Sequence, residues 1–156
     1  MNSYVTVDLL KSSSVLNVTG TGDDTRLRIL AESQSRLIDR LTNRHFYALT
    51  ATRTFDVTDT AEVLLPDLAA ITSLATDDNI DRTFETTWAT TDYRLRPSNA
   101  DPASRFNGDS RPYTSVIVDS NGTRSFTLGD ETVQIVGEWG WWLHKATATE
   151  TADAIS

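Results

Sequence analysis

The apolar residues of this chain change their spacing near Asn43, and that change divides the sequence into two kinds of structure. Before Asn43, apolar residues recur at intervals of three, four and seven, as they do on one face of an α-helix. After it, residues 52–57 alternate between polar and apolar, which is typical of a β-strand. The sequence therefore predicts a helix over residues 24–42 inside a helical region 1–45, followed by a β-rich region 50–140.

The two regions are expected to form a single α+β domain spanning residues 1–156. Asp23 and Asp24 offer a cap and favourable charge at the start of the helix. Its apolar stripe needs a hydrophobic surface, so we expect the N-terminal helix to pack on an antiparallel β region and to bury Leu27, Leu30, Leu37 and Leu41. The Ala- and Thr-rich residues 143–156 are expected to form a short C-terminal helical tail.

Two turn signals divide the β-rich region. Pro66-Asp67 is predicted to end one strand and precede the next. Asn121-Gly122 tolerates the positive φ values of a type I′ turn. It therefore predicts a hairpin whose two strands are residues 115–119 and 124–128.

The net charge of −8 argues against specific binding to nucleic acid. An acidic surface repels phosphate and gains nothing from counterion release, although DNA could slide through an acidic channel without sticking. The chain has no Cys, which excludes disulfides and thiolate metal sites. No apolar run approaches the roughly 20 residues of a membrane-spanning helix. The first residues lack the features of a signal peptide, so assembly in the cytoplasm is expected.

No group of residues predicts catalysis, a cofactor or a bound metal. His45 and His144 are the only histidines, too few for a three-histidine zinc site. Residues 77–81 begin like a calcium loop, but Arg82 stands where the loop needs Gly and Trp88 where it needs a bidentate Glu. We therefore expect the chain not to be an enzyme, with no catalytic, cofactor-binding or metal-binding residues, and we interpret residues 77–81 as a solvated turn.

Three tryptophans in four residues are the most unusual feature of the composition. Trp139, Trp141 and Trp142 each carry a large apolar surface. On a strand, Trp139 and Trp141 point to one face and Trp142 to the other. Three interpretations stay open: a plug in the domain's own core, an anchor at a subunit interface, and a platform on which sugars stack.

An ordered series of short segments resembles a known family. The series runs over residues 20–142 and consists of Asp23-Asp24, Asn43-Arg44-His45-Phe46, Arg53-Thr54-Phe55-Asp56, Leu64-Leu65-Pro66-Asp67-Leu68, Ile71-Thr72-Ser73-Leu74, the stretch from Trp88 to Ala100, and Val133-Gln134-Ile135-Val136-Gly137-Glu138-Trp139-Gly140-Trp141. In this order the segments resemble the head–tail connector, or adaptor, proteins of long-tailed phages. No single segment is specific to that family, and only the series carries the resemblance.

The resemblance implies a structural virion protein. Its copies would form a ring of about twelve between the portal protein and the next connector or tail protein, in the neck of the particle. Packaged DNA would pass through the ring without specific binding, and no membrane would be involved. In such adaptors the C-terminal part commonly docks to the portal, so we expect Trp139, Trp141, Trp142, His144 and Lys145 to contact the portal or a neighbouring subunit. Longer relatives continue here into a long helix, whereas this sequence has a short Ala- and Thr-rich tail, so that either the helix is reduced or the chain is cut short. The alternative function is a carbohydrate- or protein-binding β-rich module.

Overall fold

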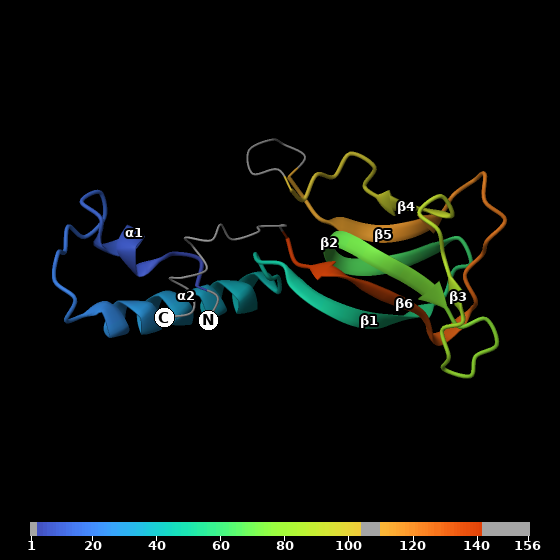
Figure 1. Ribbon diagram of the computed structural model, residues 1–156, viewed down its shortest axis with the longest axis horizontal. Helices are drawn as coiled ribbons and strands as arrows, with labels where there is room; N and C mark the ends of the chain where they lie inside the picture. The colour runs from blue at the N-terminus through green and yellow to red at the C-terminus, as the bar shows by residue number, and fades with distance from the viewer. Residues whose placement is uncertain (1–2, 104–109, 142–156) are drawn as a thin grey trace. The chain divides into compact units, whose positions relative to one another are not determined.

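The computed structural model describes residues 3–103 and 110–141, which belong to two compact units (Figure 1). The helical unit extends to Phe46 and contains α1 (Val7–Lys11) and α2 (Asp24–Thr42). The β unit begins at Tyr47 and contains six strands: β1 (Leu49–Val57), β2 (Glu62–Thr76), β3 (Thr86–Thr87), β4 (Tyr93–Arg96), β5 (Tyr113–Val118) and β6 (Gly129–Trp139). Neither helix of the described chain is long and apolar enough to cross a membrane.

The predicted bounds of the long helix are confirmed, but the predicted fold class is wrong. Helix α2 begins at Asp24 and ends at Thr42, and Asn43 closes it in the left-handed conformation with φ of 52°. The described chain is mostly antiparallel sheet, however, with two short helices in a separate compact unit, and it is not the predicted α+β fold. The predicted helical tail, residues 143–156, lies outside the described residues. The single-domain organisation stays a prediction.

Helix α2 buries a different face from the one that its leucines predict. Ala31, Ser35 and Asp39 are the buried residues of the helix, and they follow one another at intervals of four. The apolar stripe points elsewhere, since Leu30 is 54% and Leu41 78% exposed. The expected burial of Leu30, Leu37 and Leu41 is therefore wrong for this chain by itself, and Leu27 is half-buried.

Strand β2 holds the sheet together because it changes partners halfway. All pairings are antiparallel, in the order β1-β6-β2-β5-β4, with β3 added to β2. The first half of β2 pairs with β5 and the second half with β6, and Leu68 is aligned with a residue of each. Pro66 lies in the register shift before Leu68, where its missing N–H interrupts no regular ladder. The predicted turn at Pro66-Asp67 is therefore replaced by continuous strand.

The predicted hairpin around Asn121-Gly122 is also absent from the described chain. Strand β5 already has β2 on one edge and β4 on the other, so it has no edge left for residues 124–128. Phe126, which belongs to those residues, is 1% exposed. Its ring instead stacks on the ring of Trp88, at a centroid distance of 4.6 Å. The Phe126 N–H donates to the carbonyl of Thr60 at 2.9 Å.

The hydrophobic core belongs to the β unit. Its buried members all lie between Val57 and Trp139: Val57, Val63, Leu65, Leu68, Leu74, Trp88, Tyr93, Val116, Phe126, Val133, Ile135 and Trp139. Strand β6 lies between β1 and β2 and contributes three of them. Burying each large side chain stabilises the fold by about 1.5–3 kcal/mol, so the β unit has the core of an independently folded unit.

Substitution of Gly137 tests how closely β6 approaches β2. A Cβ at this position would lie 2.5 Å from the carbonyl oxygen of Ala70 and 3.0 Å from Cδ1 of Leu68. Because one of these atoms belongs to the backbone, the strands must shift, and we expect Gly137→Ala to lower the free energy of unfolding by about 1–3 kcal/mol. Urea denaturation followed by tryptophan fluorescence measures it.

The matched control is Gly22→Ala, because a Cβ at Gly22 meets nothing within 4 Å. We expect this variant to unfold close to the wild-type midpoint. Equal midpoints for the two alanine variants would contradict the packing of β6 against β2.

Candidate functional site

The residues predicted to form an interface do not gather into one described site. Trp139 is 1% exposed, its ring lies 5.5 Å from that of Phe55, and its Nε1–H donates to the carbonyl of Ala51 at 2.9 Å. The guanidinium carbon of Arg53 lies 4.6 Å from the Trp139 ring centre, within range of a cation–π contact. Trp139 therefore plugs the core of the β unit, one of the three interpretations that the sequence left open.

The rest of the predicted interface is half-buried or outside the described chain. Trp141 is half-buried and follows Gly140, whose φ is 147°. Trp142, His144 and Lys145 lie outside the described residues. Their contact with a portal or a neighbouring subunit stays a prediction, and the buried ring of Trp139 is not available to a partner or to a stacked sugar.

The acidic loop after β2 brings three carboxylates together. One carboxylate oxygen each of Asp77, Asp81 and Glu85 lies within 4.8 Å of the others, so these are the described residues that could hold a metal. Asp77 is 2% exposed and already accepts hydrogen bonds from the backbone N–H groups of Asn79, Ile80, Asp81 and Arg82, at 3.3, 2.7, 3.2 and 2.6 Å. A cation would have to compete with four donors for this carboxylate. The Asp77 carboxylate therefore holds the backbone of the loop in place, including Ile80 and Arg82, whose φ values are 62° and 70°.

Two shallow clefts of the β unit lack a nucleophile paired with a base among the described residues. The first, of about 250 Å³, is lined by Thr76, Asp78, Trp88, Thr123, Arg124, Ser125 and Thr127. The hydroxyl of Thr86 donates to Asp78 at 2.6 Å, and this bond is the main cause that lowers the pKa of the Asp78 carboxyl. Asp78 is therefore a weak base. The second, of about 440 Å³, is lined by Ile71, Thr90, Tyr93, Arg94, Leu95, Ser98 and Tyr113.

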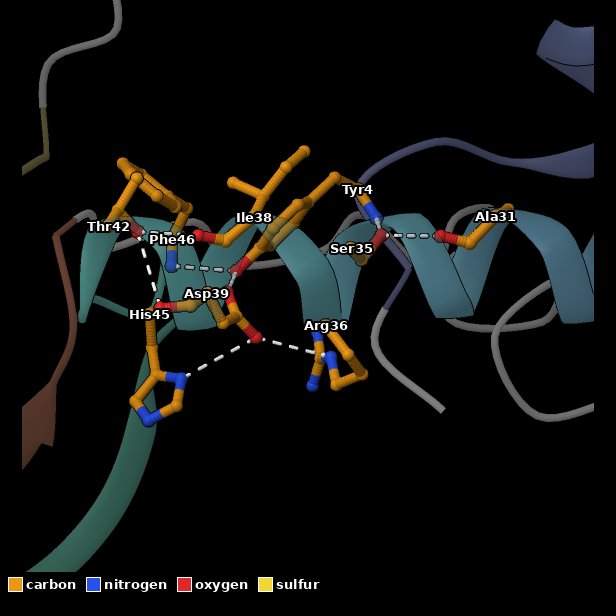
Figure 2. A network of polar contacts seen from close by, with 9 residues as sticks. All are labelled: Tyr4, Ala31, Ser35, Arg36, Ile38, Asp39, Thr42, His45 and Phe46. Carbon is orange, nitrogen blue, oxygen red and sulfur yellow. Dashed lines mark hydrogen bonds and ion pairs between the residues drawn. The ribbon is translucent and has the colours of Figure 1, made fainter.

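A second polar cluster of the described chain lies in the helical unit, around Asp39 (Figure 2). Asp39 is 7% exposed and projects from the last turns of α2. The hydroxyl of Tyr4 donates to its Oδ1, Arg36 Nε lies 3.1 Å from its Oδ2, and His45 Nδ1 lies 3.7 Å from the same oxygen. A buried carboxylate needs such partners, because an unpaired charge there would be strongly destabilising.

Tyr4 joins three segments of the helical unit. Its backbone N–H donates to Ser35 Oγ at 2.9 Å, and its hydroxyl accepts from the N–H of Phe46 at 3.0 Å. The rings of Tyr4 and Phe46 meet edge to face at 5.8 Å. The N-terminal segment is thereby attached both to α2 and to the residues that follow it.

The cluster combines residue types found in hydrolases, yet its geometry is structural. Ser35 Oγ donates to the carbonyl of Ala31 at 2.7 Å and accepts from Tyr4, and Ser35 is 2% exposed. A nucleophilic serine would instead have to donate to a base. The Asp39 cluster was not predicted from the sequence, because the leucines of α2 form the more conspicuous pattern. The signal was present as small or polar residues every four positions, at Ala31, Ser35 and Asp39.

Comparisons with known proteins add no relative. No protein-family model matches the chain, and the searches of curated proteins and of solved structures found no match either.

The Tyr4 hydroxyl predicts a loss of stability at alkaline pH. Burial, and then the hydrogen bond to Asp39, raise the pKa of Tyr4 to about 12. The unfolded chain loses this proton near pH 10, so the stability that Tyr4 provides is complete below about pH 10 and is lost as the pH rises to about 12. We expect Tyr4→Phe to destabilise the helical unit by about 1–3 kcal/mol at neutral pH and to reduce this alkaline loss.

Thermal unfolding followed by far-ultraviolet circular dichroism, at pH 7 and across pH 9–12, measures both effects. Tyr93→Phe is the control, because Tyr93 has its pKa raised by burial within the β unit and does not belong to the Asp39 cluster. If Tyr4→Phe kept the wild-type alkaline profile of the helical signal, the role assigned to the Tyr4 hydroxyl would be wrong.

Proposed function

We propose that the chain is a structural head–tail connector subunit of a tailed phage, which assembles into a ring between portal and tail and catalyses no reaction. The observation that carries the proposal is that the described residues of the helical unit bury one hydrophobic side chain, that of Ala31. The resemblance of the ordered segments between residues 20 and 142 supplies the biological setting, the neck of the virion after assembly in the host cytoplasm.

The helical unit displays its apolar side chains on the surface. Among its described residues, Ala31 is the one buried hydrophobic. Nine of the thirteen exposed large hydrophobic residues of the described chain belong to this unit: Leu9, Val15, Leu16, Val18, Ile29, Leu30, Leu37, Ile38 and Leu41. A unit this small with one buried alanine has too little core to be stable alone, and a helix of 19 residues is marginal in water. Contact with other chains would provide the missing stability by mass action.

The charge of the chain supports a ring through which DNA passes. Residues 1–46 have six Lys and Arg against five Asp and Glu, a formal charge of +1. Residues 47–144 have seven Arg against fifteen Asp and Glu, a formal charge of −8. An acidic β unit facing a channel would repel the phosphate backbone and leave DNA free to move.

The partners of the proposed ring are the portal protein on one side and the next connector or tail protein on the other. The segment from Trp141 onward, with Trp142, His144 and Lys145, is the part proposed to reach them. Trp139 is not part of that contact, since its ring fills the core of the β unit. An interface of this kind needs an exposed aromatic or cationic anchor.

The test is the mass and shape of the full-length protein. Light scattering behind size-exclusion chromatography should give a multiple of the single-chain mass, and negative-stain images should show rings of about twelve copies. Co-sedimentation with purified portal rings should retain the protein. A monomer at micromolar concentration that binds glycans would contradict the connector and favour the binding-module alternative.

Duplex DNA should not be retained by the assembled protein. The acidic charge predicts no mobility shift at physiological salt, and adding salt should change nothing, because no counterions are released. Tight binding that weakens steeply as the salt concentration rises would contradict the proposed channel lining.

A further inference from the structure

We propose that two separate apolar surfaces of the helical unit dock onto each other in successive copies of the chain. The first, the α2 stripe, consists of Leu30, Leu37, Ile38 and Leu41. The second, the loop patch, consists of Leu9 on α1 and Val15, Leu16 and Val18 in the loop that follows. This inference rests on the proposed ring and names the contact that would build it.

The α2 stripe is continuous along one side of the helix. Leu37 and Leu41 are one turn apart, and Leu30 lies two turns before Leu37, so the three project in nearly the same direction. Their side chains are 41%, 78% and 54% exposed. Within the helical unit, the N-terminal segment covers a different face, through Tyr4, Ser35 and Asp39. Within the helical unit, the stripe is therefore left uncovered.

The loop patch is presented by an ordered backbone. The N–H groups of Val15 and Asn17 donate to the carbonyl of Ser12 at 3.1 and 2.9 Å, and the N–H of Val18 donates to the carbonyl of Lys11 at 3.0 Å. The loop is fastened to the start of α2 by Lys11 Nζ, 2.7 Å from Asp24 Oδ1. Because the backbone is held in this way, Val15, Leu16 and Val18 face solvent and have little freedom to fold inward. This order reduces the entropic cost of docking.

The two surfaces differ, so they allow two kinds of assembly. A single head-to-tail contact closes into a ring or continues as a filament, whereas a two-fold dimer would make the same contact twice. The ring follows from the proposed connector, and the mass of the wild-type protein distinguishes it from a dimer.

The charges at the two ends identify the occupant of each surface as a second copy. Asp8 and Asp23 are exposed at the end that carries the loop patch. Arg40 is exposed beside the C-terminal part of the α2 stripe. Docking the stripe of one copy on the loop patch of the next would bring these opposite charges together, and such complementarity sets orientation and suppresses stripe-to-stripe pairing.

The experiment uses complementary variants of the full-length chain. The stripe variant carries Leu37→Asp and Leu41→Asp, and the loop variant carries Val15→Asp and Leu16→Asp. The control carries Thr25→Asp and Ser33→Asp, two exposed positions of α2 outside the stripe. Light scattering gives the mass of each variant, and the fluorescence of the tryptophans reports whether the β unit stays folded.

We expect the control to assemble like the wild type, and each variant alone to be monomeric with a folded β unit. An equimolar mixture of the two variants should form a dimer of one chain of each, because the intact stripe of one meets the intact loop patch of the other. If the wild type forms rings and either variant still does, or if the mixture stays monomeric, these surfaces are not the contact and the connector proposal stands. A monomeric wild type would overturn both.

Discussion

The hydrogen bond from the Tyr4 hydroxyl to the buried carboxylate of Asp39 decides which face of α2 turns inward, and the organisation of the helical unit depends on it. Tyr4 occupies the face formed by Ala31, Ser35 and Asp39 through a hydroxyl, a backbone N–H and an aromatic ring. With that face covered by polar contacts, the leucines of α2 are left on the surface. The helical unit is therefore held together by hydrogen bonds and by few apolar contacts.

The β unit is held together by an apolar core instead. The twelve buried residues of its core cluster lie between Val57 and Trp139, and β2 links the two halves of the sheet by pairing with β5 and then with β6. With a core of this kind, the β unit can be stable in a single chain, without contacts to other copies. The helical unit, with Ala31 as its buried hydrophobic among the described residues, would gain its stability from contacts with other copies. On this account, one unit provides a rigid body and the other provides assembly.

Local signals in the sequence were sufficient where the structure is local. The period of the leucines and the stop at Asn43 predicted both ends of α2, because each depends on residues within a few turns. The buried face was not predictable in the same way, since Tyr4 reaches Asp39 from 35 residues away. Pro66-Asp67 was interpreted as a turn, but it lies where β2 changes partners. A turn does form at Asn121, with the Gly122 N–H donating to the carbonyl of Asp119 at 2.9 Å, but it does not lead into a hairpin because β5 has no free edge for the segment that follows. Such competition between strands is decided by tertiary pairing and leaves no short-range mark.

In the candidate sites too, local features were predictable from the sequence and tertiary contacts were not. The carboxylates of residues 77–85 could be suspected from their spacing, and the structure explains them as a loop organised by Asp77. Trp139 was recognised as unusual, yet only the packing against Phe55 and Arg53 identifies it as a core residue. The Asp39 cluster was missed because its members come from both sides of α2 in sequence and are ordinary residues when taken singly.

Amide hydrogen exchange across a dilution series tests most directly the claim that the helical unit depends on neighbouring copies. Exchange protection reports the free energy of local opening, and a helix stabilised by assembly must lose protection as the copies dissociate. The account predicts that α2 is protected at high protein concentration and exchanges rapidly on dilution, while β6 keeps its protection throughout. Protection of α2 that equals that of β6 and does not change with concentration would contradict it.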